Sequence, residues 1–329
     1  TTTTSSSTTT TTTGGGWQVV SNAGSLKGEI GISMLSSNEG WIAGNANELF
    51  HLTYASGSSP TWETVDCGVV TSGALQDVVA YTTNRIWISG RDDTGSSIYY
   101  TANGGSTWTA QVNTDIRYPG RTATLDRINM LSFVVEGANI YGWAAGGLSD
   151  NTPLILKTTD GVSWEESYHP DITFGQLRSI EFISTREGLA VGDGGLIIKS
   201  TDGGTTWTSQ ESGTIENLYE VRWSDESKAY AVGTTGTVLR TVNGGTVWTP
   251  LSLGATTHLY ALAVRSSKIW TGGDDGKIYY SSNSGATWSL QTSNTTQWIN
   301  TITMLSDTSG WAVGGQNNAS AGGVILRTT

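Results

Sequence analysis

Short stretches in which apolar and polar residues alternate recur along most of the chain. Residues 180–183 (Ile-Glu-Phe-Ile) and 302–305 (Ile-Thr-Met-Leu) are two examples, and Gly, Asn and Asp residues border such stretches. A period of two between turn residues is typical of a half-buried β-strand. The sequence therefore predicts many short strands joined by tight turns.

A five-residue motif accompanies these strands seven times. It consists of an aromatic residue or Leu, small or β-branched residues, and a final Gly, and its copies stand at residues 40–44, 86–90, 142–146, 188–192, 229–233, 269–273 and 310–314. Each copy follows an alternating strand and precedes a third strand, and in most repeats a turn then leads to a fourth strand that opens with Trp. Repeats of about 40 to 56 residues with four antiparallel strands are typical of propeller blades. We predict an all-β, seven-bladed β-propeller.

The turn between the third and fourth strands is a second motif. It reads Ser-Thr-Asp-Gly-Gly-Thr-Thr-Trp at residues 200–207, and it resembles the Asp-box, or BNR repeat. The Asp or Asn is expected to accept hydrogen bonds from turn amides, the glycines to take positive φ, and the Trp to pack the hairpin onto its blade. The predicted box residues are Asn103, Trp108, Asp160, Trp164, Asp202, Trp207, Asn243, Trp248, Asn283 and Trp288.

The last repeat lacks its fourth strand, because the chain stops at Thr329, where a box would begin. Residues 14–20 instead read as the end of a box followed by a strand. We predict that this N-terminal strand completes the last blade, which removes two exposed sheet edges. The expected organisation is a Thr/Ser/Gly-rich tract at residues 1–16 and a propeller at residues 17–329.

Seven repeats with sequence motifs such as GWAVG, ILRTT and TDGGTTW resemble the photosystem II assembly and stability factor family of propellers. The resemblance implies the fold and a protein partner. Members of that family hold a membrane-protein partner on a basic patch, whereas this chain has a net charge of −11 and no dense Arg cluster. Asp-boxes also occur in sialidases, in xyloglucanases and in propellers without activity, so they do not fix a reaction.

The charge and the composition of the chain limit the classes of partner and the cellular locations that the sequence favours. The acidic balance argues against nucleic acid and anionic lipid, and no apolar run is long enough to span a membrane. The N-terminal tract has nothing apolar to bury, so it is either a flexible linker or a stalk that carries O-linked sugars. The candidate O-glycosylation sites are Thr1, Thr2, Thr3, Thr4, Ser5, Ser6, Ser7, Thr8, Thr9, Thr10, Thr11, Thr12 and Thr13. Both readings favour an extracellular, cell-surface or periplasmic location.

The sequence predicts no catalytic residues, no metal site and no cofactor. The three His residues stand in different repeats without the spacing of metal ligands, and neighbouring Asp residues in loops are expected to form turns. If the protein binds a ligand, the loops between second and third strands and between blades are the better candidates. The residues predicted on that face are Asp92, Asp93, Arg117, Tyr118, Arg121, Tyr168, His169, Phe174, Asp193, Asp274, Asp275 and Trp298.

The sequence thus indicates a non-catalytic extracellular or surface propeller that acts as a binding or assembly scaffold for a protein or glycan. A sharper form of this hypothesis is a self-assembling, glycosylated filament subunit, in which the N-terminal tract docks on the next copy. The alternative is a glycoside hydrolase or a carbohydrate-binding propeller domain, which would need carboxyl groups about 5 to 10 Å apart across a substrate.

Overall fold

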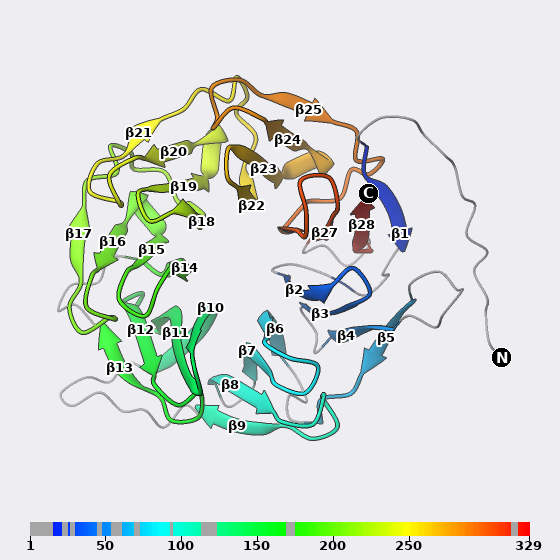
Figure 1. Ribbon diagram of the computed structural model, residues 1–329, viewed down its shortest axis with the longest axis vertical. Coiled ribbons are helices and arrows are strands. Elements are labelled where there is room, and N and C mark those ends of the chain that lie inside the picture. Colours follow the sequence, from blue (N-terminus) through cyan, green and yellow to red (C-terminus); the bar gives the residue numbers. More distant parts are fainter. Residues whose placement is uncertain are drawn as a thin grey trace.

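The computed structural model describes residues 16–21, 26, 30–44, 48–53, 61–68, 73–92, 95–112, 124–168, 175–316 and 322–329. These residues form seven four-stranded antiparallel sheets arranged around one axis (Figure 1). The predicted all-β, seven-bladed propeller is confirmed. In the same part of the chain, no helix has both the length and the apolar character that a membrane crossing needs.

The blades are numbered here in chain order, and each is given from its innermost to its outermost strand. Blades 1 to 3 are β2 (Gly31–Ser36), β3 (Glu39–Gly44), β4 (Glu48–Thr53), β5 (Thr61–Val65); β6 (Gly73–Ala80), β7 (Ile86–Asp92), β8 (Gly95–Thr101), β9 (Thr109–Val112); and β10 (Leu125–Glu136), β11 (Asn139–Leu148), β12 (Pro153–Thr158), β13 (Glu165–Tyr168). Blades 4 to 6 are β14 (Leu177–Phe182), β15 (Gly188–Gly192), β16 (Ile197–Ser200), β17 (Thr208–Gln210); β18 (Leu218–Asp225), β19 (Lys228–Gly233), β20 (Val238–Thr241), β21 (Thr249–Pro250); and β22 (Leu259–Arg265), β23 (Lys268–Gly273), β24 (Ile278–Ser281), β25 (Ser289–Gln291). Blade 7 is β26 (Thr301–Met304), β27 (Gly310–Gly314), β28 (Val324–Thr328) and β1 (Gln18–Ser21). Short 3₁₀ turns η1 (Asp193–Gly195), η2 (Thr234–Gly236) and η3 (Asp274–Gly276) join the second and third strands of blades 4, 5 and 6.

Blade 7 closes the ring as the sequence predicted. Strand β1 pairs antiparallel with β28, with Gln18 opposite Arg327 and Val19 opposite Leu326. Just before β1, the buried Trp17 donates a hydrogen bond from Nε1 to Gln291 Oε1 of blade 6 at 2.9 Å, and its backbone N–H donates to the Thr292 carbonyl at 3.0 Å. The N-terminal strand therefore joins the last blade and also fastens that blade to its neighbour.

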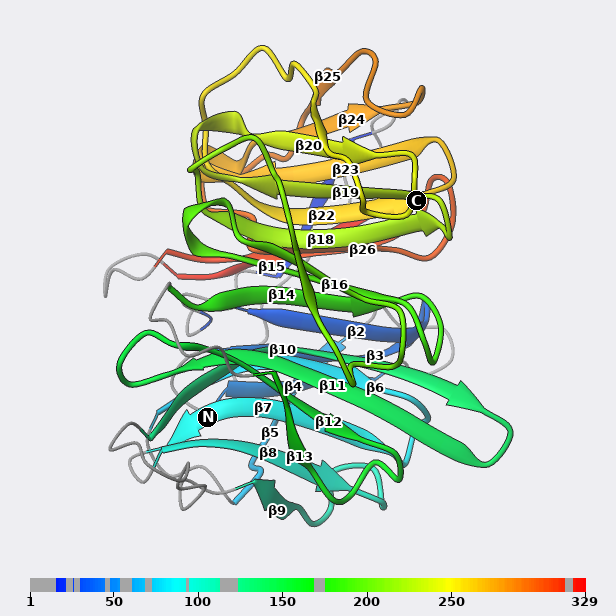
Figure 2. The same cartoon turned by 90° about the vertical axis from the view of Figure 1, so that its left-hand side faces the viewer.

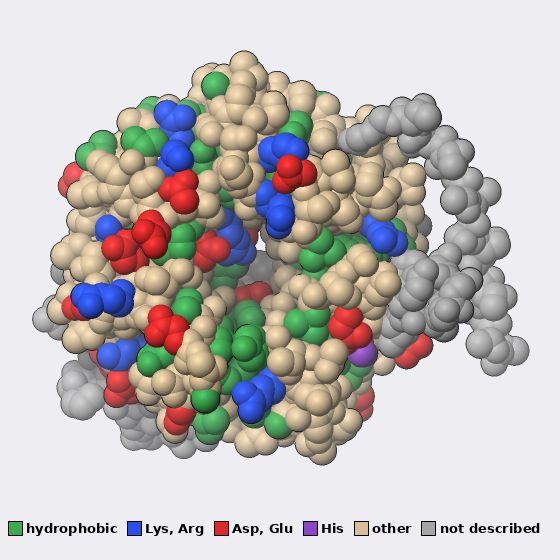
Figure 3. All heavy atoms as spheres, viewed as in Figure 1, with side chains coloured by type: hydrophobic (Ala, Val, Ile, Leu, Met, Phe, Trp, Pro, Cys, Tyr) green, Lys and Arg blue, Asp and Glu red, His purple; other side chains and the backbone are tan. Residues whose placement is uncertain are grey.

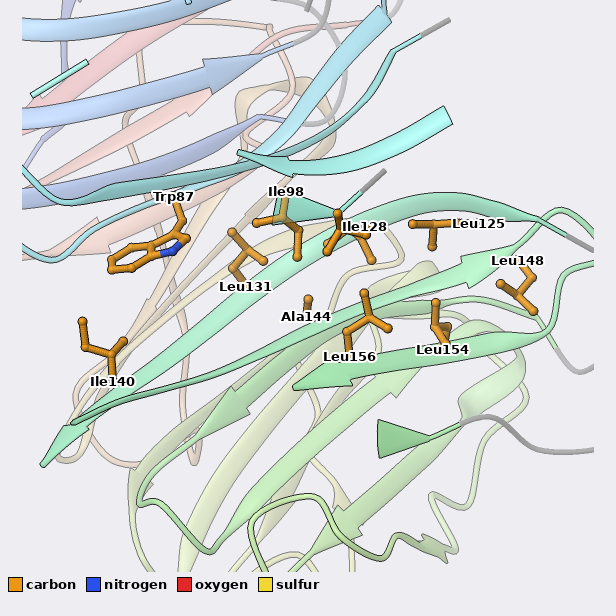
Figure 4. Packing of buried hydrophobic residues seen from close by; sticks show 11 residues of the cluster. Trp87, Ile98, Leu125, Ile128, Leu131, Ile140, Ala144, Leu148, Leu154 and Leu156 are labelled. Carbon is orange, nitrogen blue, oxygen red and sulfur yellow. The ribbon is translucent and has the colours of Figure 1, made fainter. Parts of the chain in front are cut away.

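Apolar side chains fill the spaces between blades. Figure 4 shows the layer between blades 2 and 3, where Trp87 and Ile98 face Ile128 and Leu131 of β10. Almost all of these side chains are completely buried. Because each sheet presents apolar residues to both neighbours, the blades stack as in Figure 2, with the long β10–β11 hairpin reaching beyond the others.

The turn predicted to be an Asp-box is held by its own side chains. In blade 4, Asp202 Oδ1 accepts hydrogen bonds from the Thr206 N–H at 2.8 Å and the Ser200 hydroxyl at 2.9 Å, while Ser200 Oγ accepts from the Gly204 N–H. The aromatic residue of the five-residue motif then reaches the turn of the next blade, since Trp143 Nε1 of blade 3 donates to the Gly203 carbonyl at 3.1 Å. The two repeated motifs thus connect successive blades.

Candidate binding site at the mouth of the axial channel

A cavity of about 370 Å³ lies on the axis of the ring, at the end where the first strands begin. We call it the axial cavity. Its lining residues come from all seven blades and are Ile30, Gly31, Gln76, Asp77, Asn129, Met130, Arg178, Tyr219, Glu220, Tyr260, Trp298, Asn300 and Thr301. Figure 1 shows why these blades share one site, because β2, β6, β10, β14, β18 and β22 are innermost in the ring. Figure 3 views the opposite end of the ring, which carries the hairpins between first and second strands, and there acidic and basic side chains are both scattered around the central opening.

A β-bulge in the first strand aims five of these side chains into the cavity. In blade 5, Leu218 pairs with Gly233 and Glu220 with Val232, so Tyr219 between them has no partner in the ladder. A bulge leaves one residue unpaired and redirects its side chain. The residues in the same position of blades 2, 3, 4 and 6 are Gln76, Asn129, Arg178 and Tyr260.

The final glycine of the five-residue motif makes room for these bulges. A Cβ on Gly233 would lie 2.0 Å from the Asn217 carbonyl oxygen, and one on Gly273 would lie 1.7 Å from that of His258. Glycine inside a strand is expected where another backbone approaches closely. The repeated Gly therefore has a steric cause, which is the path of the first strand ahead of its bulge.

Below the bulges, side chains of one first strand accept hydrogen bonds from the next. Asp77 Oδ2 accepts from the Leu131 N–H at 2.9 Å, Ser179 Oγ accepts from the Val221 N–H at 3.2 Å, and Glu220 accepts from the Leu262 N–H. These bonds run between backbone and side chain because neighbouring first strands belong to different sheets and form no backbone ladder with one another. They fix the angular positions of the blades around the cavity.

Three buried carboxyl groups and one guanidinium lie near the axis. Burial raises the pKa of Asp77 to about 6 and that of Glu220 to about 7, although Arg222 opposes the shift. Burial also raises the pKa of Glu181. Arg222 Nη2 lies 2.5 Å from Glu220 Oε1, and burial, which lowers the pKa of Arg222, is outweighed by the three carboxylates, which raise it. Carboxyl groups thus outnumber positive charge in this part of the channel.

Aromatic rings from three successive blades form one wall of the axial cavity. The ring centroids of Tyr219 and Tyr260 are 5.2 Å apart, and those of Tyr260 and Trp298 are 5.5 Å apart. All three side chains are only half-buried, so their rings remain available to a ligand. Rings on a fixed scaffold supply contact area at a small entropic cost.

Two Asp residues predicted on this face hold lining residues in place. Asp193 binds Arg178 with both oxygens, at 2.8 Å to Nε and 3.0 Å to Nη2, and also accepts from the Gln176 N–H. Asp274 accepts from the Tyr260 hydroxyl at 2.9 Å and from the His258 N–H at 3.2 Å. Both carboxylates therefore have positioning roles at the cavity.

The remaining predicted residues fall in different places. Trp298 lines the axial cavity. Asp275 is exposed, has a positive φ of 57°, and its Oδ2 atom lies 3.6 Å from Lys277 Nζ. Tyr168 ends the outer strand β13, where it packs against Trp207, and it does not line the cavity. Asp92 ends β7 opposite Gly95. Outside the described residues lie Asp93, Arg117, Tyr118, Arg121, His169, Phe174 and the candidate glycosylation sites at residues 1–13, which stay predictions.

Sequence reasoning missed the bulge residues Gln76, Asn129, Arg178, Tyr219 and Tyr260. A signal existed for all of them except Asn129, because the other four stand 13 or 14 residues before the last glycine of their five-residue motifs. Among the residues with described structure, no group of three or more His, Cys, Asp or Glu side chains is arranged to hold a metal ion.

Comparison with known proteins finds likeness to one family and to solved propellers. The sequence model described as photosynthesis system II assembly factor YCF48 matches residues 4–141, which is less than half of the chain. The structure described as YCF48 bound to D1 peptide is 18% identical with a TM-score of 0.69, covering 95% of this chain and 96% of that one. YCF48 from Cyanidioschyzon merolae is 14% identical with a TM-score of 0.69, covering 95% and 98%. The WD40 β-propeller domain of Doa1 is 12% identical with a TM-score of 0.66, covering 95% and 97%. No curated protein matches the chain.

These findings correct one expectation and confirm another. The predicted extracellular, cell-surface or periplasmic location is contradicted, because the matching family consists of photosystem II assembly factors, which belong in the thylakoid lumen or the chloroplast. The error arose because a Thr/Ser-rich tract, whether linker or stalk, was taken to indicate a secreted or surface protein. The likeness of the repeats to the photosystem II assembly factor propellers is confirmed.

Proposed function

We propose that this chain is a non-catalytic scaffold that binds a segment of a partner protein in the axial cavity. The observation that carries the proposal is the cavity itself, in which five bulges aim side chains of different chemistry at one point on the axis. A cavity of this size with an aromatic wall and a few polar groups suits a few residues of an extended peptide.

Two further observations support this proposal. A propeller of similar fold, YCF48, has a solved structure bound to D1 peptide. In addition, Asp193 and Asp274 already have hydrogen-bond partners within their own blades, which supports a positioning role for them over a hydrolytic one. The self-assembling, glycosylated filament subunit stays a prediction, because the tract on which it depends lies outside the described residues.

A cavity-filling variant tests the proposal. A peptide library displayed on phage is selected on the immobilised full chain, and the enriched peptides are then measured by fluorescence anisotropy. Thr301 lines the axial cavity, so Thr301→Trp should abolish their binding, whereas Thr249→Trp on the exposed outer strand β21 should leave it unchanged. Failure to enrich any peptide, or equal binding to both variants, would refute the proposal.

A further inference from the structure

We propose that the axial cavity selects an arginine or lysine side chain of the bound segment. This inference rests on the proposed function and adds the chemistry of the residue that enters the cavity. Three independent features of the lining point to it: unpaired acceptors, an excess of carboxyl groups and an aromatic wall.

The first feature is a pair of buried acceptors without donors. Gln76 is only 9% exposed, lines the cavity, and its Oε1 atom accepts no hydrogen bond from the described part of the chain. Asn129 Oδ1 is likewise buried and unpaired, and its amide is fixed because Nδ2 donates to the Leu177 carbonyl at 2.6 Å. Buried polar atoms nearly always have partners, so two acceptors that lack a donor among the described residues and belong to side chains lining one cavity favour a ligand that donates hydrogen bonds. Guanidinium and ammonium groups are donors only.

The second feature is charge. Asp77 and Glu220 line the cavity and Glu181 lies near them, while Arg222 is the guanidinium that interacts with all three. Arg178 also lines the cavity, but both oxygens of Asp193 bind it. Because Asp193 neutralises Arg178, the three carboxyl groups face one unneutralised guanidinium, that of Arg222. A further cation would offset the remaining negative charge of the ionised carboxylates.

The third feature is the aromatic wall of Tyr219, Tyr260 and Trp298. A cation over the face of a Trp or Tyr ring is attracted by the ring quadrupole, and a guanidinium also stacks on such rings. Hydrogen-bond acceptors and rings in one cavity together recognise both parts of a basic side chain.

Binding of a cation should also depend on pH. A positive charge near Asp77 and Glu220 favours their ionised forms, so a basic peptide should bind more tightly as the pH rises from about 5 to 8. The ionisable and charged groups that face the cavity or its two acidic residues are Asp77, Glu181, Glu220, Arg222, Tyr219, Tyr260 and the Arg178–Asp193 pair.

The test uses four blocked pentapeptides of sequence Gly-Gly-Xaa-Gly-Gly, in which Xaa is Arg, Lys, citrulline or Glu. Citrulline matches the shape of Arg without its charge. Binding to the full chain is measured by ligand-observed NMR. We expect the Arg and Lys peptides to bind roughly tenfold more tightly than the citrulline and Glu peptides. Trp298→Leu and Glu220→Gln should remove most of that preference, and Glu226→Gln, at an exposed turn, should keep it. The thermal midpoint of each variant shows that it is folded.

The outcomes separate this inference from the proposed function. Equal binding of the four peptides, binding by none of them, or a preference that survives Glu220→Gln overturns the selection of a basic side chain. If library peptides still bind in a Thr301→Trp-sensitive manner in those cases, the protein-binding scaffold stands. If no library peptide binds at all, both proposals fail together.

Discussion

Replacing Trp17 by Ala should destabilise the whole propeller, because this one side chain fastens the closing strand to two blades. Its ring is 1% exposed and packs in the same core as Trp270, Ile278 and Ile299 of blades 6 and 7. Its Nε1 atom donates to Gln291 Oε1 at 2.9 Å. Removing the ring therefore empties part of an interblade core and breaks the hydrogen bond that links the N-terminal segment to blade 6.

The expected cost can be worked from this burial. A buried Trp truncated to Ala loses about 3–5 kcal/mol of unfolding free energy, since the apolar contacts vanish and the cavity does not fully collapse. Trp17→Phe keeps most of the apolar contact but loses the hydrogen bond, so it should cost about 1–2 kcal/mol. With an unfolding entropy of roughly 2 cal/mol/K per residue, the Ala variant of this 329-residue chain should melt about 4–7 °C lower.

Urea unfolding followed by tryptophan fluorescence and by circular dichroism measures the effect. Val19→Ala is the matched control, because Val19 lies in the same strand but is 38% exposed, and it should change stability by less than about 0.5 kcal/mol. The reasoning is refuted if Trp17→Ala unfolds at the same urea midpoint as Val19→Ala. In that case the contacts of Trp17 contribute nothing to the stability of the closed ring.

Three other predictions concern the repeated motifs and the axial charges. Gly233→Ala should lose about 1–3 kcal/mol in urea unfolding, because the new Cβ would meet the Asn217 carbonyl oxygen at 2.0 Å; an unchanged midpoint would contradict the steric role of the motif glycine. Hydrogen bonds from the Ser163 and Val162 N–H groups lower the pKa of Asp160 to about 2, below its unfolded value, so this carboxylate stabilises the fold above about pH 4 and the stabilisation is lost as the pH falls toward 2. Asp160→Asn should therefore melt with a shallower loss between pH 4 and pH 2 than the parent chain, and equal slopes would argue against the box hydrogen bonds. Glu220 behaves in the opposite sense: burial raises its pKa to about 7, so its contribution is largest at low pH and is lost as the pH rises through 7. Glu220→Gln should reduce the fall in melting temperature between about pH 5 and pH 8, and a pH profile identical to that of the parent would show that Glu220 is not buried as an acid.

The sequence was sufficient for the fold because the repeats encode it redundantly. Each blade repeats the same strand periods, and the truncated last repeat together with Trp17 predicted how the ring closes. The five-residue motif stands in all seven blades, so the prediction of the architecture does not depend on any single copy. Such redundancy makes architecture easier to predict than chemistry.

The axial cavity could not be predicted in the same way. Strand alternation assigns Tyr219 and Tyr260 to ordinary positions in a ladder, and only the bulge, which depends on the path of the preceding backbone, turns them toward the axis. Trp298 was predicted because it is an aromatic residue in a loop ahead of a first strand, and such residues are candidates for ligand contacts. The sequence predicted Asp193 and Asp274 in loops of one face, but their contacts with Arg178 and Tyr260 become visible only in three dimensions.

The pairing of β1 with β28 also has a consequence for biosynthesis. Strand β1 leaves the ribosome before every other described strand of the propeller and β28 leaves after them, yet the two belong to one sheet. During translation the growing arc therefore carries a bare edge at each end, and such edges invite association with other chains. Fast closure of the ring therefore shortens the time for which these two edges are exposed.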